Sequence, residues 1–355
     1  MASRLDKGKY TVHVACRQRG IFCEKILKVD ANLIALNMRS KFNVGNLFKL
    51  VKIIRSNDIH LVHSQGARAD FFVRIAAGLL KKRPRIVSTI QMPVEGFDAA
   101  PLRKKIYRTL DKISERYVDK FVTVSDTLKK QLIQGHEIAE GKIAKIYNGI
   151  ELEEYEPDSD DRFKQMVRQE FGIPDSAFLI GAIGRIVWQK GFESLIRALP
   201  KIGDRLPEAK MLIVGEGPQT KKLEKLARRL SVDQALIFAG LRDDVKSILS
   251  GLDVLVIPSL LEGFPMITLE AMAMAKPIIA SNVVGISEQI ADRENGILVQ
   301  PGDITALTKE IIRLAGDKKK AEMLGWAARK RVEREFSVQK MVRQTEDVYR
   351  SILEL

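Results

Sequence analysis

The feature that most constrains the fold is an alternation of short apolar runs with longer helical patterns along the whole chain. In the first half these segments are YTVHVAC, LFKLVKIIRSN, DIHLVHS, a helix over 68–80, RIVSTI and DKFVTVS. In the second half they are FLIGAIGRI, a helix from about Gly191, MLIVGEG, a long charged helix, ALIFAG, DVLVIPS, a glutamate-bearing helix, PIIAS and GILVQP. Parallel strands need crossover helices between them, so this pattern is typical of α/β proteins. The sequence predicts two Rossmann-like domains, in keeping with its 355 residues.

The boundary between the two series follows KIYNGI, where the acidic, proline-bearing stretch ELEEYEPDSDD begins. We expect a first domain over 1–150, a linker over 151–174, a second domain over 175–335 and a final helix over 336–355. The opening stretch ASRLDKGKYTVHVAC is expected to be the end of a helix, a turn and a strand. In that interpretation the first strand, glycine loop and most of the first helix of a doubly wound domain are missing; the alternative is a domain that starts on a helix.

The positive charge of the chain is confined to its first half. Residues 1–150 hold 29 Lys and Arg against 13 Asp and Glu, a net charge of +16, so the remaining residues carry −2 of the total of +14. This asymmetry indicates an acidic partner such as an anionic membrane, an acidic substrate or nucleic acid, or else a solvated basic face. Nucleic acid ranks last because aromatic platforms and a recognised module are lacking. The basic amphipathic helix expected over Leu102–Tyr117 either packs on its own domain or contacts an anionic membrane or phosphorylated glycolipid.

The remaining composition describes an ordinary globular protein. Mean hydropathy is −0.08, and no apolar run approaches the roughly 20 residues that span a bilayer. The start MASRLDKGKY has no apolar signal-peptide region, so we expect a cytoplasmic protein, with a peripheral position on the inner face of the membrane as the alternative. Cys16 and Cys23 have neither C-x-x-C nor zinc spacing, and we expect both to be buried thiols.

Two glycine-rich turns in the second half are candidate phosphate sites. GAIGRIVWQKG sets Arg185 just past a strand and Lys190 at the start of a helix, where side-chain cations and unpaired backbone N–H groups converge. VGEGP matches the start of the dinucleotide fingerprint G-x-G-x-x-G, but Thr220 stands where the third glycine belongs. An NAD-dependent oxidoreductase therefore stays a second alternative.

LEGFPMITLEAMA places two carboxylates, Glu262 and Glu270, around the expected start of a helix at Met266. Eight residues at about 1.5 Å per residue separate them by roughly 12 Å, whereas the carboxylates of glycosidases lie about 5–9.5 Å apart. The pair is better placed to hold the two ends of an extended ligand, with the helix N-terminus offering N–H groups to a phosphate between them. The alternative is a turn cap and a solvated helix residue. The D-x-D within DSDD (158–161) is expected to be a solvated loop, and no metal site is predicted.

A family resemblance rests on four motifs of the second half. They are G-R-x4-K-G, V-G-E-G-P, I-P-S-x2-E-G-F-P-x3-L-E-A-M-A-x-A-K-P-I-I-A-S and N-G-I-L-V-x-P-G-D. This arrangement resembles the donor-binding half of glycosyltransferase family 4. The resemblance implies the GT-B fold: two Rossmann-like domains with parallel sheets facing a central cleft, and a C-terminal helix that crosses back to the N-terminal domain.

The resemblance also implies site residues and roles. Glu262 matches the family's glutamate that contacts hydroxyls of the donor sugar. Glu270 matches the glutamate that binds the nucleotide ribose. Arg185 and Lys190 match the basic pair that binds the β-phosphate. Gly263, Phe264 and Met266 complete the expected donor site. Members of this kind retain anomeric configuration and need no metal or other cofactor.

The implied function is sugar transfer from a nucleotide diphosphate sugar to a lipid-linked, lipopolysaccharide-type or other cell-envelope glycan. Gln91 and His63 are the acceptor-side candidates. Gln65 and Gln91 stand at positions where many relatives carry histidines. For His63 a structural role is favoured. The alternative is a truncated, non-catalytic relative that binds the nucleotide sugar.

Overall fold

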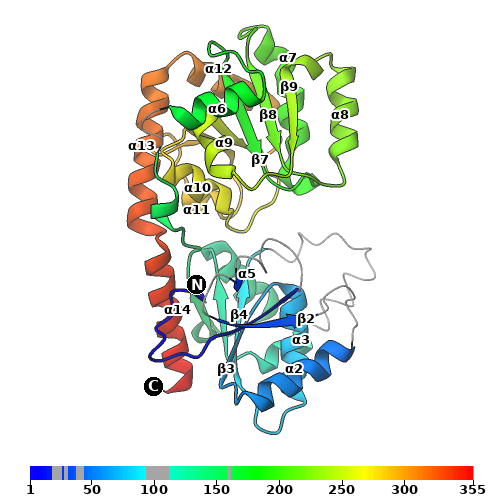
Figure 1. The fold of residues 1–355 in the computed structure, drawn as a ribbon, viewed down its shortest axis with the longest axis vertical. Coiled ribbons are helices and arrows are strands. Elements are labelled where there is room, and N and C mark those ends of the chain that lie inside the picture. The colour runs from blue at the N-terminus through cyan, green and yellow to red at the C-terminus, as the bar shows by residue number, and fades with distance from the viewer. Residues whose placement is uncertain (18–25, 28–30, 37–43, 93–111, 158–160, 355) are drawn as a thin grey trace. The chain divides into compact units, whose positions relative to one another are not determined.

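The computed structural model describes residues 1–17, 26–27, 31–36, 44–92, 112–157 and 161–354 (Figure 1). The chain divides into two compact units. The N-terminal unit combines Met1–Tyr147 with Val338–Leu355, and the C-terminal unit comprises Asn148–Ser337. In both units the paired strands are parallel, which confirms the predicted α/β class.

The N-terminal unit contains two parallel sheets. One pairs β1 (His13–Arg17) with β2 (Asn32–Leu36), and the other has the order β3-β4-β5-β6. The strands of the second sheet are β3 (Leu61–Gln65), β4 (Arg85–Ile90), β5 (Lys120–Thr123) and β6 (Ile143–Lys145). The helices are α2 (Val44–Ser56), α3 (Ala67–Gly78), α5 (Asp126–His136) and α14 (Val338–Leu353), with the 3-10 turns η2 (Glu115–Tyr117) and η3 (Glu140–Lys142).

Two features of this unit differ from the sequence-based expectation. Residues 1–12 form turns, closed by bonds such as the Arg4 N–H to the Met1 carbonyl at 2.8 Å, where the end of a helix was predicted. Strand β2 was not predicted, although its apolar run NLIAL is bounded by turn-forming residues at Asp30 and Asn37.

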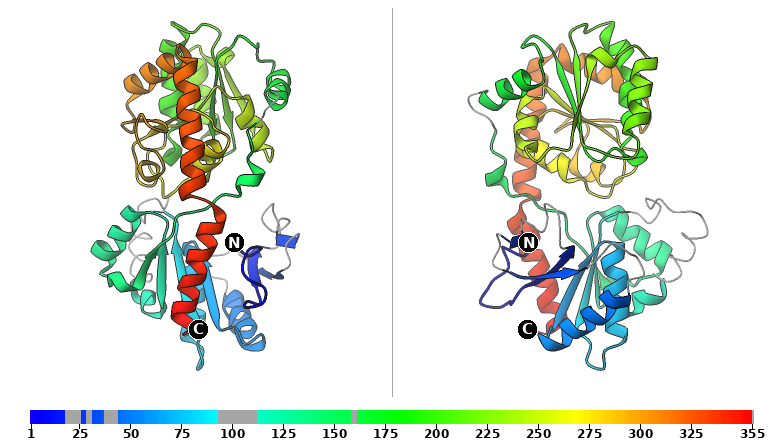
Figure 2. Two further views of the ribbon diagram at one scale, coloured as in Figure 1. Left: turned by 90° about the vertical axis from the view of Figure 1, so that its left-hand side faces the viewer. Right: turned by 45° about the vertical axis from the view of Figure 1, so that its right-hand side comes forward.

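The helix α14 packs on the sheet of the N-terminal unit, as the left view of Figure 2 shows. Its buried residues Val342, Val348 and Tyr349 form one hydrophobic cluster with Val87 of β4 and Val122 of β5. The residues that follow the C-terminal unit therefore complete the core of the N-terminal unit, in agreement with the expected return of the last helix.

The C-terminal unit is built on a six-stranded parallel sheet of order β12-β11-β10-β7-β8-β9. Its strands are β7 (Leu179–Ile183), β8 (Lys210–Val214), β9 (Leu236–Gly240), β10 (Val254–Ile257), β11 (Ile278–Ser281) and β12 (Ile297–Val299). Its longer helices are α6 (Arg162–Glu170), α7 (Phe192–Gly203), α8 (Thr220–Arg229), α10 (Met266–Ala273), α12 (Ile304–Ala315) and α13 (Lys318–Glu335). Shorter segments are α9 (Val245–Gly251), α11 (Ile286–Gln289), η4 (Leu152–Glu154), η5 (Trp188–Lys190) and η6 (Asp233–Ala235).

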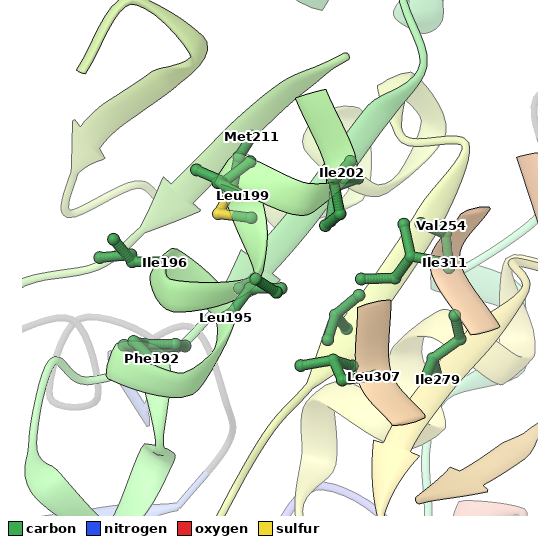
Figure 3. Packing of buried hydrophobic residues seen from close by; sticks show 14 of the residues in the cluster. Phe192, Leu195, Ile196, Leu199, Ile202, Met211, Val254, Ile279, Leu307 and Ile311 are labelled. Atoms are coloured by element: carbon green, nitrogen blue, oxygen red, sulfur yellow. The ribbon is translucent and has the colours of Figure 1, made fainter. Parts of the chain in front are cut away.

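The core of the C-terminal unit lies where α7 and α12 pack on the sheet (Figure 3). The apolar face of α7 meets Met211 of β8, and Leu307 and Ile311 of α12 lie close to Val254. All four residues of β10 are buried, as expected for a strand covered on both faces. This packing fixes the carboxyl edge of the sheet, from which the candidate site loops emerge.

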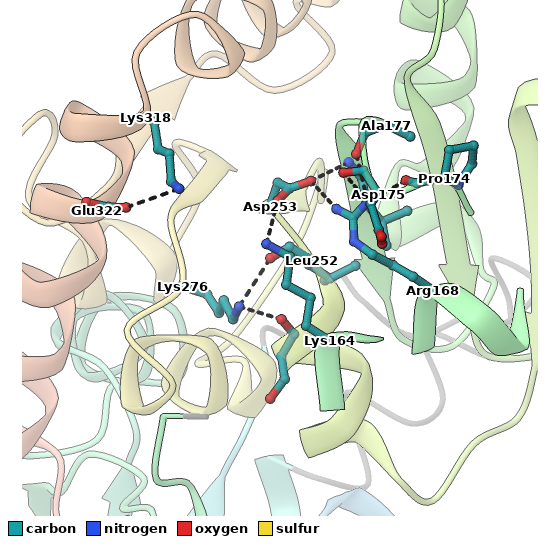
Figure 4. A network of polar contacts seen from close by, with 12 residues as sticks. Lys164, Arg168, Pro174, Asp175, Ala177, Leu252, Asp253, Lys276, Lys318 and Glu322 are labelled. Carbon is teal, nitrogen blue, oxygen red and sulfur yellow. Dashed lines mark hydrogen bonds and ion pairs between the residues drawn. The ribbon is translucent and has the colours of Figure 1, made fainter. Parts of the chain in front are cut away.

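The expected linker over 151–174 contains the helix α6, which packs against α9. Arg168 of α6 is 3% exposed and forms an ion pair with Asp253 at 2.7 Å (Figure 4). Its guanidinium also donates to the carbonyls of Pro174 at 2.7 Å and Ala177 at 3.0 Å. Asp253 in turn accepts the N–H of Leu179 at the start of β7. The second half of the predicted linker is therefore an integral part of the C-terminal unit.

Within the described ranges, every helix is too short or too polar to cross a lipid bilayer.

Candidate functional site

The candidate site is formed by three loops at the carboxyl edge of the C-terminal sheet. They are the β7 loop (184–190), the β8 loop (215–219) and the β10 loop (258–265). Backbone bonds join them: the Ile186 N–H donates to the Glu216 carbonyl at 2.8 Å, and the Leu260 N–H donates to the Gln189 carbonyl at 2.7 Å. The loops therefore form one connected surface at the place where open α/β sheets bind ligands.

Lys190 and Glu262, two of the predicted site residues, form an ion pair between the β7 and β10 loops. The Lys190 Nζ lies 2.6 Å from the Glu262 Oε1, and the Ser259 hydroxyl donates to the same oxygen at 2.8 Å. Glu262 is 5% exposed, and a carboxylate so buried is costly without a charged partner. The cation from the β7 loop and the carboxylate from the β10 loop are thus held within reach of one ligand.

Arg185 lies in the β7 loop and is exposed. It follows Gly184, whose φ of 149° suits glycine, and an ideal Cβ on Gly184 would lie 3.6 Å from the Lys190 side chain. The two predicted cations therefore come from one short loop, with Arg185 open to solvent and Lys190 paired with Glu262.

The helix α10 begins at Met266, as predicted, with Pro265 immediately before it. No side chain caps its first turn among the described residues. Two amides fix the approach to the helix: the Gln289 Nε2 donates to the Pro265 carbonyl at 3.0 Å, and the Asn148 Nδ2 donates to the Phe264 carbonyl at 3.2 Å. Backbone N–H groups at a helix start form an anion site together with the helix dipole.

Glu270 lies one helical turn inside α10 and is partly exposed, whereas Glu262 lies in the loop before the helix. The Tyr155 hydroxyl hydrogen-bonds to Glu270. Burial and the neighbouring Glu270 charge raise the pKa of Tyr155 well above its usual value. Glu270 is therefore a structured carboxylate with a neighbouring hydroxyl rather than a solvated surface charge.

Glycines allow the β10 loop and its neighbours to approach each other. At Gly285, with a φ of 76°, an ideal Cβ would lie 1.8 Å from the Gly263 carbonyl oxygen. We expect Gly285→Ala to lower the stability of the C-terminal unit by about 1–3 kcal/mol, because the β10 loop must shift. The matched control is Gly302→Ala, which has a φ of 78° and no atom within 4 Å of the ideal Cβ. Thermal unfolding midpoints compare the two; equal losses would contradict the steric explanation.

The acceptor-side candidates lie in the N-terminal unit. The Nδ1 of His63 lies 2.5 Å from the Tyr349 hydroxyl, and its Nε2 lies 2.6 Å from the Thr89 hydroxyl. Burial lowers the pKa of His63 to about 4, so the ring is neutral near pH 7. Both ring nitrogens are engaged within the unit, which fits a structural role. Gln91 directly follows β4 and is partly buried, and Gln65 ends β3 with an exposed side chain.

Several sequence-based predictions fall outside the described residues. They are most of the basic helix over 102–117, three residues of the D-x-D stretch at 158–160, and Cys23. Cys16 is buried, as predicted.

Sequence reasoning missed two residues that contact the predicted ones, Ser259 and Tyr155. Ser259 had a usable signal, because a polar residue follows the apolar strand of β10 at the carboxyl edge. Tyr155 had none, because it lies in the acidic stretch more than a hundred positions before Glu270.

Comparisons with known proteins bear on the family and the fold of the chain. A family model described as Glycosyltransferase Family 4 matches residues 1–154, and a model described as Glycosyl transferases group 1 matches residues 163–331. An uncharacterized glycosyltransferase of Methanocaldococcus jannaschii is 34% identical over 236 residues, covering 66% of this chain and 60% of that protein.

A relative that matches nearly the whole chain is the Escherichia coli UDP-Gal:alpha-D-GlcNAc-diphosphoundecaprenol alpha-1,3-galactosyltransferase. It is 25% identical, with 97% of this chain and 90% of that protein covered. Among solved structures, Anabaena HepE in complex with UDP-glucose has a TM-score of 0.84 at 21% identity and covers 96% of this chain and 91% of its own. Since the two family models together match most of the sequence and the solved relatives share the fold, the chain belongs to glycosyltransferase family 4 and is a glycosyltransferase of the GT-B fold.

Proposed function

We propose that this glycosyltransferase transfers a sugar from a nucleotide diphosphate sugar to a glycan acceptor, with retention of anomeric configuration and without a metal ion. The observation that carries the proposal is the Lys190–Glu262 pair, 2.6 Å apart, beside the uncapped start of α10. A cation, a buried carboxylate and backbone N–H groups at one place match the diphosphate and the sugar of such a donor.

The role proposed for each site side chain follows from its own charge. Glu262 accepts hydrogen bonds from hydroxyls of the donor sugar, and Glu270 accepts them from the ribose. Arg185 and Lys190 bind the β-phosphate, and the backbone around Gly263, Phe264 and Met266 presents the N–H groups of the β10 loop and α10. Negative charge develops on the diphosphate as it leaves, and fixed cations and dipoles aimed at that charge stabilise the transition state most.

The reaction needs no second carboxylate at the anomeric carbon. The bond from the anomeric carbon to the phosphate oxygen breaks, and a new bond forms to the acceptor hydroxyl oxygen on the same face. The acceptor proton passes to an oxygen of the leaving phosphate, so the atoms and charges balance. The cations of the β7 loop take the place that a metal ion occupies in other diphosphate enzymes.

We further propose that the acceptor is a lipid-linked, lipopolysaccharide-type or other cell-envelope glycan. Two observations favour this class. Residues 1–150 carry a net charge of +16, which suits a phosphorylated acceptor or an anionic membrane. The E. coli relative is named for a diphosphoundecaprenol acceptor, and a Staphylococcus aureus relative, 26% identical over 320 residues, is named for capsular polysaccharide biosynthesis.

Titration calorimetry against UDP-, GDP- and ADP-sugars tests the donor proposal. One of these donors is expected to bind, and Glu270→Ala to weaken it about tenfold or more, because a hydrogen bond to a charged group is lost. Arg185→Ala is expected to lower turnover more than binding, since the charge it meets grows in the transition state. Unchanged affinity in Glu270→Ala together with unchanged turnover in Arg185→Ala would contradict these roles.

A further inference from the structure

Tyr155 connects the first segment of the C-terminal unit to the helix α10. It follows the turn η4 and is partly buried, and its hydroxyl bonds to Glu270. Because burial and the Glu270 charge both disfavour the phenolate, the hydroxyl keeps its proton at neutral pH. Toward a carboxylate a protonated phenol acts as a donor, so the direction of this hydrogen bond is fixed.

The backbone of Tyr155 is held in place by Arg329 of α13. Arg329 is 8% exposed, and its Nη1 donates to the Tyr155 carbonyl at 2.8 Å and to the Ala273 carbonyl at 2.5 Å. Ala273 is the last residue of α10. One guanidinium therefore fixes both the segment that carries Tyr155 and the helix that carries Glu270.

The same guanidinium is anchored by carboxylates on either side. Its Nη2 lies 3.2 Å from Glu156, the neighbour of Tyr155, and its Nε lies 2.5 Å from Glu333 on α13. A planar guanidinium with several bonds has little rotational freedom, so the distance between Tyr155 and α10 is held by a rigid connector.

We propose that Tyr155 is a positioning residue, which orients the Glu270 carboxylate for the ribose hydroxyls of the donor. This inference rests on the proposed function of Glu270. A carboxylate offers about four acceptor positions, and the bond from Tyr155 occupies one of them and restricts the side-chain rotamer. A preoriented carboxylate loses less side-chain entropy when the nucleotide binds.

The test compares two nucleotides in wild-type and Tyr155→Phe protein by calorimetry. The first is whichever of UDP, GDP and ADP binds most tightly, and the second is its 2′,3′-dideoxy analogue, which lacks the ribose diol. Tyr155→Phe is expected to weaken the parent nucleotide about fivefold and to leave the affinity for the dideoxy analogue unchanged, because only the parent uses the oriented carboxylate. In turnover, the variant is expected to raise the KM for the donor sugar with little change in kcat.

Two controls separate the possible results. Tyr117→Phe removes a tyrosine hydroxyl in the N-terminal unit, where it accepts from Arg116 at 2.9 Å, and is expected to bind both nucleotides as the wild type does. Glu270→Ala tests the proposed function itself. If Glu270→Ala weakens the parent nucleotide and Tyr155→Phe does not, the positioning role is overturned and the ribose role of Glu270 stands.

Equal weakening of both nucleotides by Tyr155→Phe would also overturn the positioning role, since the loss would then not involve the ribose. Unchanged affinity in Glu270→Ala would overturn the proposed function and the positioning role together. Because the Phe ring keeps the volume of Tyr155, folding of the variant is expected to be intact, and a far-ultraviolet circular dichroism spectrum checks it.

Discussion

Lys190→Ala is expected to lower kcat by about 10²–10³-fold, the loss typical when one fixed donor to a developing charge is removed. Lys190 lies 2.6 Å from Glu262, so the variant loses a cation at the proposed diphosphate site and also leaves a buried carboxylate without its charged partner. An uncompensated negative charge at this place repels the donor phosphates. Release of nucleoside diphosphate under saturating donor and acceptor measures the effect.

The control for this prediction is Lys221→Ala, which removes an exposed lysine of α8 in the same unit and is expected to keep wild-type turnover. A second variant, Lys190→Gln with Glu262→Gln, removes both charges of the pair. It is expected to fold better than Lys190→Ala but to remain slow, because neutral amides do not stabilise the leaving group as a cation does. Wild-type turnover in Lys190→Ala would rule out a role for Lys190 in catalysis.

Arg168→Met is expected to destabilise the C-terminal unit by about 3–5 kcal/mol, the usual cost of breaking a buried ion pair by removing one partner. Arg168 is 3% exposed, pairs with Asp253 and donates to the carbonyls of Pro174 and Ala177, so its loss removes one ion pair and two hydrogen bonds that hold α6 to the unit. Both tryptophans of the chain, Trp188 and Trp326, lie in this unit. Urea unfolding followed by tryptophan fluorescence therefore reports on this unit.

The matched control is Lys164→Met on the same helix. Its Nζ lies 3.9 Å from Asp253 and its side chain is 34% exposed, so the expected cost is about 0–1 kcal/mol. Similar urea midpoints for the two variants would show that the burial of Arg168 does not set the stability of α6.

The elements of the C-terminal unit could be predicted because local signals agree with the tertiary structure. The strand runs around Val254 and Ile278 are continuously apolar, and the Gly263–Pro265 segment directly precedes the helix that begins at Met266. The sequence also predicted that Lys190 lies at the start of one helix and that Glu262 precedes another, and the structure adds the 2.6 Å contact between them.

What could not be predicted depends on contacts between distant parts of the chain. Tyr155 meets Glu270, and Arg329 meets the Tyr155 carbonyl, across separations that leave no periodicity or spacing in the sequence. The helix α6 was assigned to a linker because its flanking residues are acidic and include prolines. Its stability comes from the buried ion pair of Arg168, a tertiary interaction that overrides local composition.

The return of α14 to the N-terminal unit bears on the order in which the protein matures on the ribosome. The strands β3–β6 are synthesised early, but the hydrophobic cluster around Val87 and Val122 also includes Val342, Val348 and Tyr349 near the end of the chain. The C-terminal unit is continuous in sequence and can close before these residues emerge. The core of the N-terminal unit is thus completed only after the whole C-terminal unit has been synthesised, the reverse of the usual amino-to-carboxyl order.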